Sequence, residues 1–108
     1  MGACQRHRRI PAMRLTDQQR RIIREAGLRH FGVAPLVFGS RVDDARRGGD
    51  IDLYIDLPMD ATEAQQRETR LWVELQRRLG ERKIDIVTAR AGQDRPIDRA
   101  ARATGVPA

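Results

Sequence analysis

The sequence predicts one small α+β domain in which helices and strands alternate along the chain. Its 108 residues leave room for a single hydrophobic core. Apolar residues recur at helical spacing in the segments 17–31 and 61–79, and they alternate with polar residues in 50–57 and 83–87. The predicted order is therefore helix, strand, strand, helix, strand, helix.

The first helix is predicted to begin after Thr16 and to stop at Gly32. Thr16 and Gln19 have the pattern of a capping box, in which each side chain bonds the backbone N–H of the other residue. Apolar residues then follow at helical spacing, at Ile22, Ile23 and Ala26.

Residues 1–13 show no periodicity and are expected to form a flexible basic tail, so that the domain spans 14–108. The chain carries 21 Lys and Arg against 15 Asp and Glu, a formal net charge of +6. Half of this net charge lies in the tail, on Arg6, Arg8 and Arg9. Met13 is a second candidate for the start of the protein.

Composition argues against several classes of protein. Aromatic and basic residues are not interleaved, so a specific nucleic-acid interface is not expected. A long apolar run is missing, which argues against a membrane span. The single cysteine, Cys4, fits a reducing compartment, and we expect a cytoplasmic protein.

Two strands are predicted next, a short apolar one at 36–38 and a longer one at 50–57. Strict alternation in the longer segment is typical of a strand with one buried face. Its apolar side consists of Ile51, Leu53, Ile55 and Leu57, and its polar side of Asp50, Asp52, Tyr54 and Asp56. Pro58 is expected to end the strand. Tyr54 could either line a ligand pocket or pack across strands.

The second half of the chain is predicted as helix, strand and helix. Asp60 and Glu63 suggest a second capping box for helix 61–79, whose leucine stripe is expected to take Trp72 into the core. A third strand, 83–87, alternates around Asp85. The last helix is expected to open at Asp94 and Pro96 and to end at Gly105 and Pro107.

Asp50 and Asp52 are the strongest candidates for chemistry. Because they are two residues apart on a strand, their carboxylates point to the same side, about 7 Å apart. Aspartate is a poor strand former, which favours a selected site over a merely solvated face. Hard carboxylate oxygens suit Mg²⁺, and Asp85 on a neighbouring strand would complete a two-metal site for phosphoryl transfer. Asp56, near the strand end, is expected to be an ordinary surface residue.

Gly39 and Ser40 supply a candidate anion site. A strand that ends in Gly-Ser and turns into a helix offers free backbone N–H groups and a hydroxyl to a phosphate. Arg41, Arg46 or Arg47 could neutralise the charge of that phosphate.

The segment 37–55, with Gly39-Ser40 and Asp50-x-Asp52, resembles the signature of the nucleotidyltransferase superfamily, whose fold is shared with the DNA polymerase β palm. The short chain is most similar to the minimal nucleotidyltransferases (MNT), which are commonly encoded beside HEPN-domain ribonuclease toxins as their antitoxins. The resemblance covers roughly residues 13–105. It implies a small mixed sheet with helices packed mainly on one face.

The resemblance also implies roles for individual residues. Gly39 and Ser40 would hold the triphosphate of ATP, helped by Arg41. Asp50 and Asp52 would bind two Mg²⁺ ions. Asp85 would bind one of them and act as, or position, the base. AMP would be transferred to a hydroxyl, expected to be a tyrosine of the cognate HEPN toxin.

Two other functions remain open from the sequence. The chain could neutralise a toxin by stoichiometric binding alone, with its carboxylates not needed, or it could modify a small molecule or an RNA end. A small sheet covered mainly on one face leaves apolar surface, so an oligomer or a complex with another protein is expected.

Overall fold

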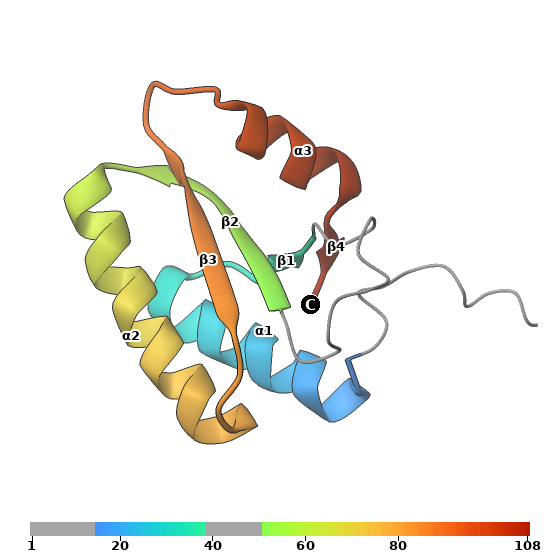
Figure 1. Cartoon of the computed structure of the whole chain (residues 1–108). Helices are drawn as coiled ribbons and strands as arrows, with labels where there is room; N and C mark the ends of the chain where they lie inside the picture. Colours follow the sequence, from blue (N-terminus) through green and yellow to red (C-terminus); the bar gives the residue numbers. More distant parts are fainter. Residues whose placement is uncertain (1–14, 39–50) are drawn as a thin grey trace, which may run out of the picture.

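The computed structural model describes residues 15–38 and 51–108 (Figure 1). The described elements are α1 (Asp17–Phe31), β1 (Leu36–Val37), β2 (Ile51–Met59), α2 (Ala61–Leu79), β3 (Ile84–Arg90), α3 (Pro96–Thr104) and β4 (Val106–Pro107). Their strands form one sheet in the order β3-β2-β1-β4. β2 and β3 are parallel, and β1 is antiparallel to both β2 and β4. The predicted α+β class and mixed sheet are confirmed.

Local capping signals account for the ends of α1. The Thr16 N–H donates to Gln19 Oε1 (2.9 Å), and the Gln19 N–H donates to Thr16 Oγ1 (3.0 Å), so the predicted capping box is formed. At the other end Gly32 adopts a left-handed conformation (φ 82°), and its N–H donates to Leu28 O. A left-handed terminal residue favours glycine, which explains the stop.

The bounds of α2 agree with the predicted 61–79, but its cap is simpler than expected. The Asp60 carboxylate accepts the Glu63 N–H (2.8 Å). The reciprocal bond of a capping box is not made, because the Glu63 carboxylate accepts from Arg67 instead.

The sheet has a different helix layer on each face. α1 and α2 pack on the face that carries the apolar side of β2. The buried residues of this core are mainly Ile23, Ala26, Phe31, Ile51, Leu53, Ile55, Ala64, Leu71 and Leu75. α3 packs on the opposite face, in a second cluster of Phe38, Tyr54, Ala89 and Ala101. Of the three described helices two therefore share a face, as expected. None of the described helices is long and apolar enough to cross a membrane.

The prediction that Pro58 ends its strand is wrong, since β2 continues to Met59. The pairing of β2 with β3 is irregular between Ile55 and Met59. A proline lacks a donor for the ladder and is tolerated where the ladder is interrupted in this way. β3 is also longer than the predicted 83–87.

The prediction missed β4. Val106 pairs with Val37 and Pro107 with Leu36, and the Ala108 N–H donates to Pro35 O (2.9 Å). Two residues are too few for an alternating pattern, and a proline can occupy an edge strand because one side of it needs no donor. α3 ends before Gly105 as predicted, but its N-cap is Arg95 rather than Asp94.

Trp72 is not in the core, contrary to the prediction: 44% of its surface is exposed. Leu71 and Leu75 of α2 are buried in the core between the helices and the sheet. Trp72 follows Leu71 directly and is therefore rotated by about 100° around the helix axis, away from that core. Tyr54 is completely buried between the sheet and α3. Of its two predicted roles, packing is therefore the one observed, and Tyr54 does not line an open pocket.

Gly27 is a close-approach position between α1 and the chain that enters β1. A Cβ added there would lie 2.3 Å from Cδ of Pro35. The ring of Pro35 therefore packs directly on the backbone of the helix.

Replacing Gly27 by alanine is expected to lower the free energy of unfolding by about 1–3 kcal/mol, because the added methyl collides with Pro35. At an open helix position the same change raises stability by about 1 kcal/mol. Urea unfolding of the native chain and of Gly27→Ala measures the change in the free energy of unfolding. A more stable Gly27→Ala variant would contradict the packing of Pro35 on α1.

Candidate functional site

Asp52 of β2 and Asp85 of β3 lie side by side. They are Cα partners in the parallel ladder, whose register also pairs Ile51 with Ile84 and Leu53 with Ile86. Paired residues of neighbouring strands point to the same face, and their strands are about 4.8 Å apart. The two carboxylates therefore project together from one face of the sheet. Asp85 is exposed and Asp52 is half-buried.

The pair lies on the same face as α3 but nearer the start of the strands. Tyr54 follows Asp52 on this face, and Val87 follows Asp85. α3 covers the later positions, where Tyr54 and Ala89 are buried against Ala101. Figure 1 shows α3 at the end of the sheet away from the start of β2. The carboxylates are thus left uncovered by the described helices.

Two described residues, Phe38 and Ile51, are next to Asp52. The Phe38 N–H, just after β1, donates to Asp52 O (3.0 Å). Ile51, the first residue of β2, is the neighbour of Asp52 in the chain. Phe38 and Ile51 are therefore both next to Asp52.

Four predicted site residues, Gly39, Ser40, Arg41 and Asp50, lie outside the described residues. Their roles in phosphate and metal binding stay predictions. Within 15–38 and 51–108, no group of three acidic, histidine or cysteine side chains is placed to hold a metal. The described part of the predicted site is therefore the pair of Asp52 and Asp85.

This pair fits a hard divalent cation. Mg²⁺ prefers carboxylate oxygens, binds through one or two of them and keeps waters or phosphates as its other ligands. Two carboxylates from adjacent strands supply such a donor set.

A buried hydrogen-bond network holds α3 beside the pair. Asp98 has no exposed surface and accepts the Tyr54 hydroxyl at Oδ1 (2.8 Å). Arg95 donates to both Asp98 oxygens, from Nη2 to Oδ1 (2.9 Å) and from Nε to Oδ2 (3.0 Å). The backbone N–H of Arg95 adds a third donor, to Oδ2 (2.8 Å). The network ties α3 to the strand that carries Asp52.

The network sets the protonation states of its members. The hydrogen bonds from Arg95 hold the pKa of Asp98 far below its usual range despite burial. Burial, together with the bond to Asp98, raises the pKa of Tyr54 to about 12. Asp98 is therefore charged and Tyr54 remains a donor at neutral pH. Asp98 has no predicted role, although an arginine three residues before an aspartate in a first helical turn is a signal for such a pair.

Asp56, expected to be an ordinary surface residue, is exposed and forms an ion pair with Arg102 of α3 (3.1 Å). The Arg102 guanidinium also lies 5.8 Å from the centre of the Tyr54 ring. This second carboxylate of β2 thus pairs with α3.

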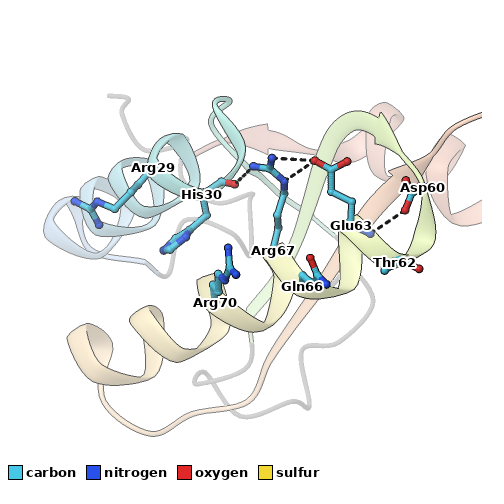
Figure 2. A pocket seen from close by; sticks show the side chains of 8 residues that line it. All are labelled: Arg29, His30, Asp60, Thr62, Glu63, Gln66, Arg67 and Arg70. Carbon is cyan, nitrogen blue, oxygen red and sulfur yellow. Dashed lines mark hydrogen bonds and ion pairs between the residues drawn. The ribbon is translucent and has the colours of Figure 1, made fainter.

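A polar hollow of about 510 Å³ lies between the end of α1 and the first turns of α2 (Figure 2). Its lining includes Arg29, His30, Arg67 and Arg70. Arg67 donates to Glu63 and to the carbonyl of His30, as the dashed lines in Figure 2 show. This hollow borders Asp60, just past the far end of β2, so it is on the order of 25 Å of strand away from Asp52. It is separate from the carboxylate pair.

A comparison of the chain with protein-family models, with curated proteins and with solved structures finds no match. The candidate site therefore stands on the geometry of Asp52 and Asp85 and on the motif around them.

Replacing Asp98 by alanine is expected to lower the free energy of unfolding by about 3 kcal/mol, because it leaves Arg95 and the Tyr54 hydroxyl without their buried partner. Asp94→Ala is the matched control: it removes an ion pair with Arg99 in which both side chains are at least 60% exposed. We expect that control to cost less than about 1 kcal/mol. Equal losses in chemical denaturation would contradict the role of the network.

Proposed function

We propose that the chain is an Mg²⁺-dependent nucleotidyltransferase that transfers AMP from ATP to a protein hydroxyl. The observation that supports this best is the in-register pairing of Asp52 with Asp85. It brings together carboxylates that are 33 positions apart in the chain. The resemblance of residues 37–55 to the nucleotidyltransferase signature supplies the reaction class.

In this proposal Asp52 and Asp85, together with Asp50, hold the metal ions. Bound Mg²⁺ would neutralise charge on the triphosphate and on the leaving pyrophosphate. Gly39, Ser40 and Arg41 would orient the triphosphate.

The transfer step is an in-line displacement. The acceptor oxygen forms a bond to the α-phosphorus of ATP, and the bond from that phosphorus to the bridging oxygen of pyrophosphate breaks. The acceptor proton passes to Asp85, whose exposed carboxylate is open to an incoming hydroxyl. The products are the AMP-modified acceptor and pyrophosphate.

We propose a tyrosine of a HEPN-domain ribonuclease toxin as the acceptor, so that the chain acts as an antitoxin in the cytoplasm. AMP on such a tyrosine adds negative charge and bulk where the toxin must bind RNA. The partner and the location follow from the resemblance. The in-register aspartate pair supports the reaction.

Co-expression with the protein encoded by the neighbouring gene tests the proposal. Intact-mass measurement of the co-purified partner is expected to show AMP increments with the native chain and none with Asp52→Asn or Asp85→Asn. Asp56→Asn is the matched control, because it removes a carboxylate from the same strand that is paired with Arg102. That variant should modify the partner as the native chain does.

Two outcomes would contradict the proposal. A partner that stays unmodified, yet is neutralised equally by the native chain and by both variants, would make the chain a stoichiometric antitoxin. Transfer of AMP to an RNA end or a small hydroxyl compound, with the partner unmodified, would keep the reaction and replace the acceptor.

A further inference from the structure

β3 forms an edge of the described sheet, with β2 as its one neighbour there. The Ile51 N–H donates to Lys83 O (3.0 Å). In a parallel ladder alternate residues bond the same neighbour, so Asp85 and Val87 also turn their backbone groups toward β2. The N–H and C=O groups of Ile84, Ile86 and Thr88 therefore face away from β2.

One end of this edge is already occupied. The Thr88 carbonyl accepts from Arg90 Nη1 (2.7 Å) and from Arg95 Nη2 (2.8 Å). Two guanidinium groups thus close the edge at Thr88. Among the described residues, no strand pairs with the outer side of the short stretch from Ile84 to Ile86, which is the open part of the edge.

A shallow hollow of mixed polarity adjoins the open part. The exposed Trp72 of α2 and the half-buried Ile86 of β3 line it, with Thr69 and Glu68, and its volume is about 220 Å³. Glu68 lies 3.8 Å from Arg90 in an ion pair, so its charge has a partner within the protein. The hollow offers the Trp72 and Ile86 side chains beside backbone groups that no described strand pairs.

We propose that the edge Ile84–Ile86 and the Trp72 hollow together bind an extended segment of another protein, which adds a short strand to β3. Backbone groups that face outward at alternate residues match an extended chain, and an adjacent hollow for one side chain provides selectivity. A helix cannot satisfy such an edge, because its own backbone groups are bonded internally.

A second copy of this chain fits the edge poorly. Two copies related by a twofold axis would pair their open stretches antiparallel, with Ile84 opposite Ile86. Asp85 would then lie directly opposite Asp85 of the other copy. Like charges in that position destabilise a sheet. A register shifted toward Thr88 is blocked by the two guanidinium groups there, and one shifted toward Arg82 is blocked by Gln76, whose side chain bonds both the N–H and the carbonyl of Arg82. The edge therefore favours a different protein.

The docking site lies close enough to the carboxylate pair to present an acceptor to it, a role that rests on the proposed function. Asp85 lies between Ile84 and Ile86, and its carboxylate projects beside Asp52. A segment bound along this edge would run past the carboxylate pair. The edge would therefore present the hydroxyl of a protein acceptor to the site.

Selection of a phage-displayed library of random seven-residue peptides on the full-length chain tests the proposal. We expect peptides with alternating apolar residues whose affinity falls about tenfold or more in Trp72→Ala. Leu28→Ala is the matched control, because Leu28 is as exposed (45%) but lies on α1, and it should bind as the native chain does. Ile86→Pro, which removes an outward N–H that an edge strand can spare, should also abolish binding, whereas Ile86→Val should keep it.

Amide hydrogen exchange gives a second readout that does not depend on a variant that must fold. In the free protein the N–H groups of Ile84 and Ile86 should exchange faster than those of Asp85 and Val87. With a selected peptide at ten times its dissociation constant, exchange at Ile84 and Ile86 should slow about tenfold.

The proposal is overturned if the selected peptides bind Trp72→Ala as well as the native chain, if no peptide is enriched, or if the chain dimerises through β3. Asp52→Asn/Asp85→Asn separates this inference from the proposed function. Peptide binding that persists in a chain without transferase activity would leave the docking site standing. Transfer to a protein without any use of this edge would leave only the function standing.

Discussion

The parallel pairing of β2 with β3 is the interaction on which the rest of the structure depends. One register buries Ile51, Leu53 and Ile55 against α1 and α2 and sets Asp52 beside Asp85 on the other face. A slip of one residue would turn the apolar side of β2 away from its core, so the burial of these side chains also fixes the carboxylate pair. The geometry of the site is thus stabilised by the hydrophobic core rather than by the aspartates themselves.

The structure is easiest to predict where the cause is local. The Thr16–Gln19 box depends on neighbouring residues and is found as expected. The alternation of β2 holds in part: Ile51, Leu53 and Ile55 are buried, but Leu57, predicted on the same apolar side, is exposed. The sequence indicated that Asp85 belongs beside Asp52, but the register that pairs them comes from contacts between distant segments. Trp72 was misplaced because a helical stripe does not distinguish adjacent positions well. β4 was missed because it exists through its pairing with β1, not through a pattern of its own.

The two sides of the carboxylate pair differ in how firmly they are held. On one side the buried Asp98 accepts from Tyr54 and Arg95 and fixes α3. The Arg95 contact is local in the sequence, but the Tyr54 contact joins residues 44 positions apart and depends on how α3 packs on the sheet. On the other side β3 presents outward backbone groups next to the exposed Trp72. In the proposed function, the face held by Asp98 would support the nucleotide site, and the edge of β3 would admit a second macromolecule.

Mn²⁺ line broadening in the NMR spectrum of the ¹⁵N-labelled full-length chain tests the central claim, that Asp52 and Asp85 act as one cation site, most directly. At less than one Mn²⁺ per chain, the account predicts that the amide signals of Asp52, Asp85 and their strand neighbours lose intensity first, and that Asp85→Asn abolishes this selectivity. Signals near Asp94 and Glu74 should persist, since both residues lie outside the paired strands β2 and β3. Broadening that starts at those carboxylates, or that is unchanged in Asp85→Asn, would contradict the account.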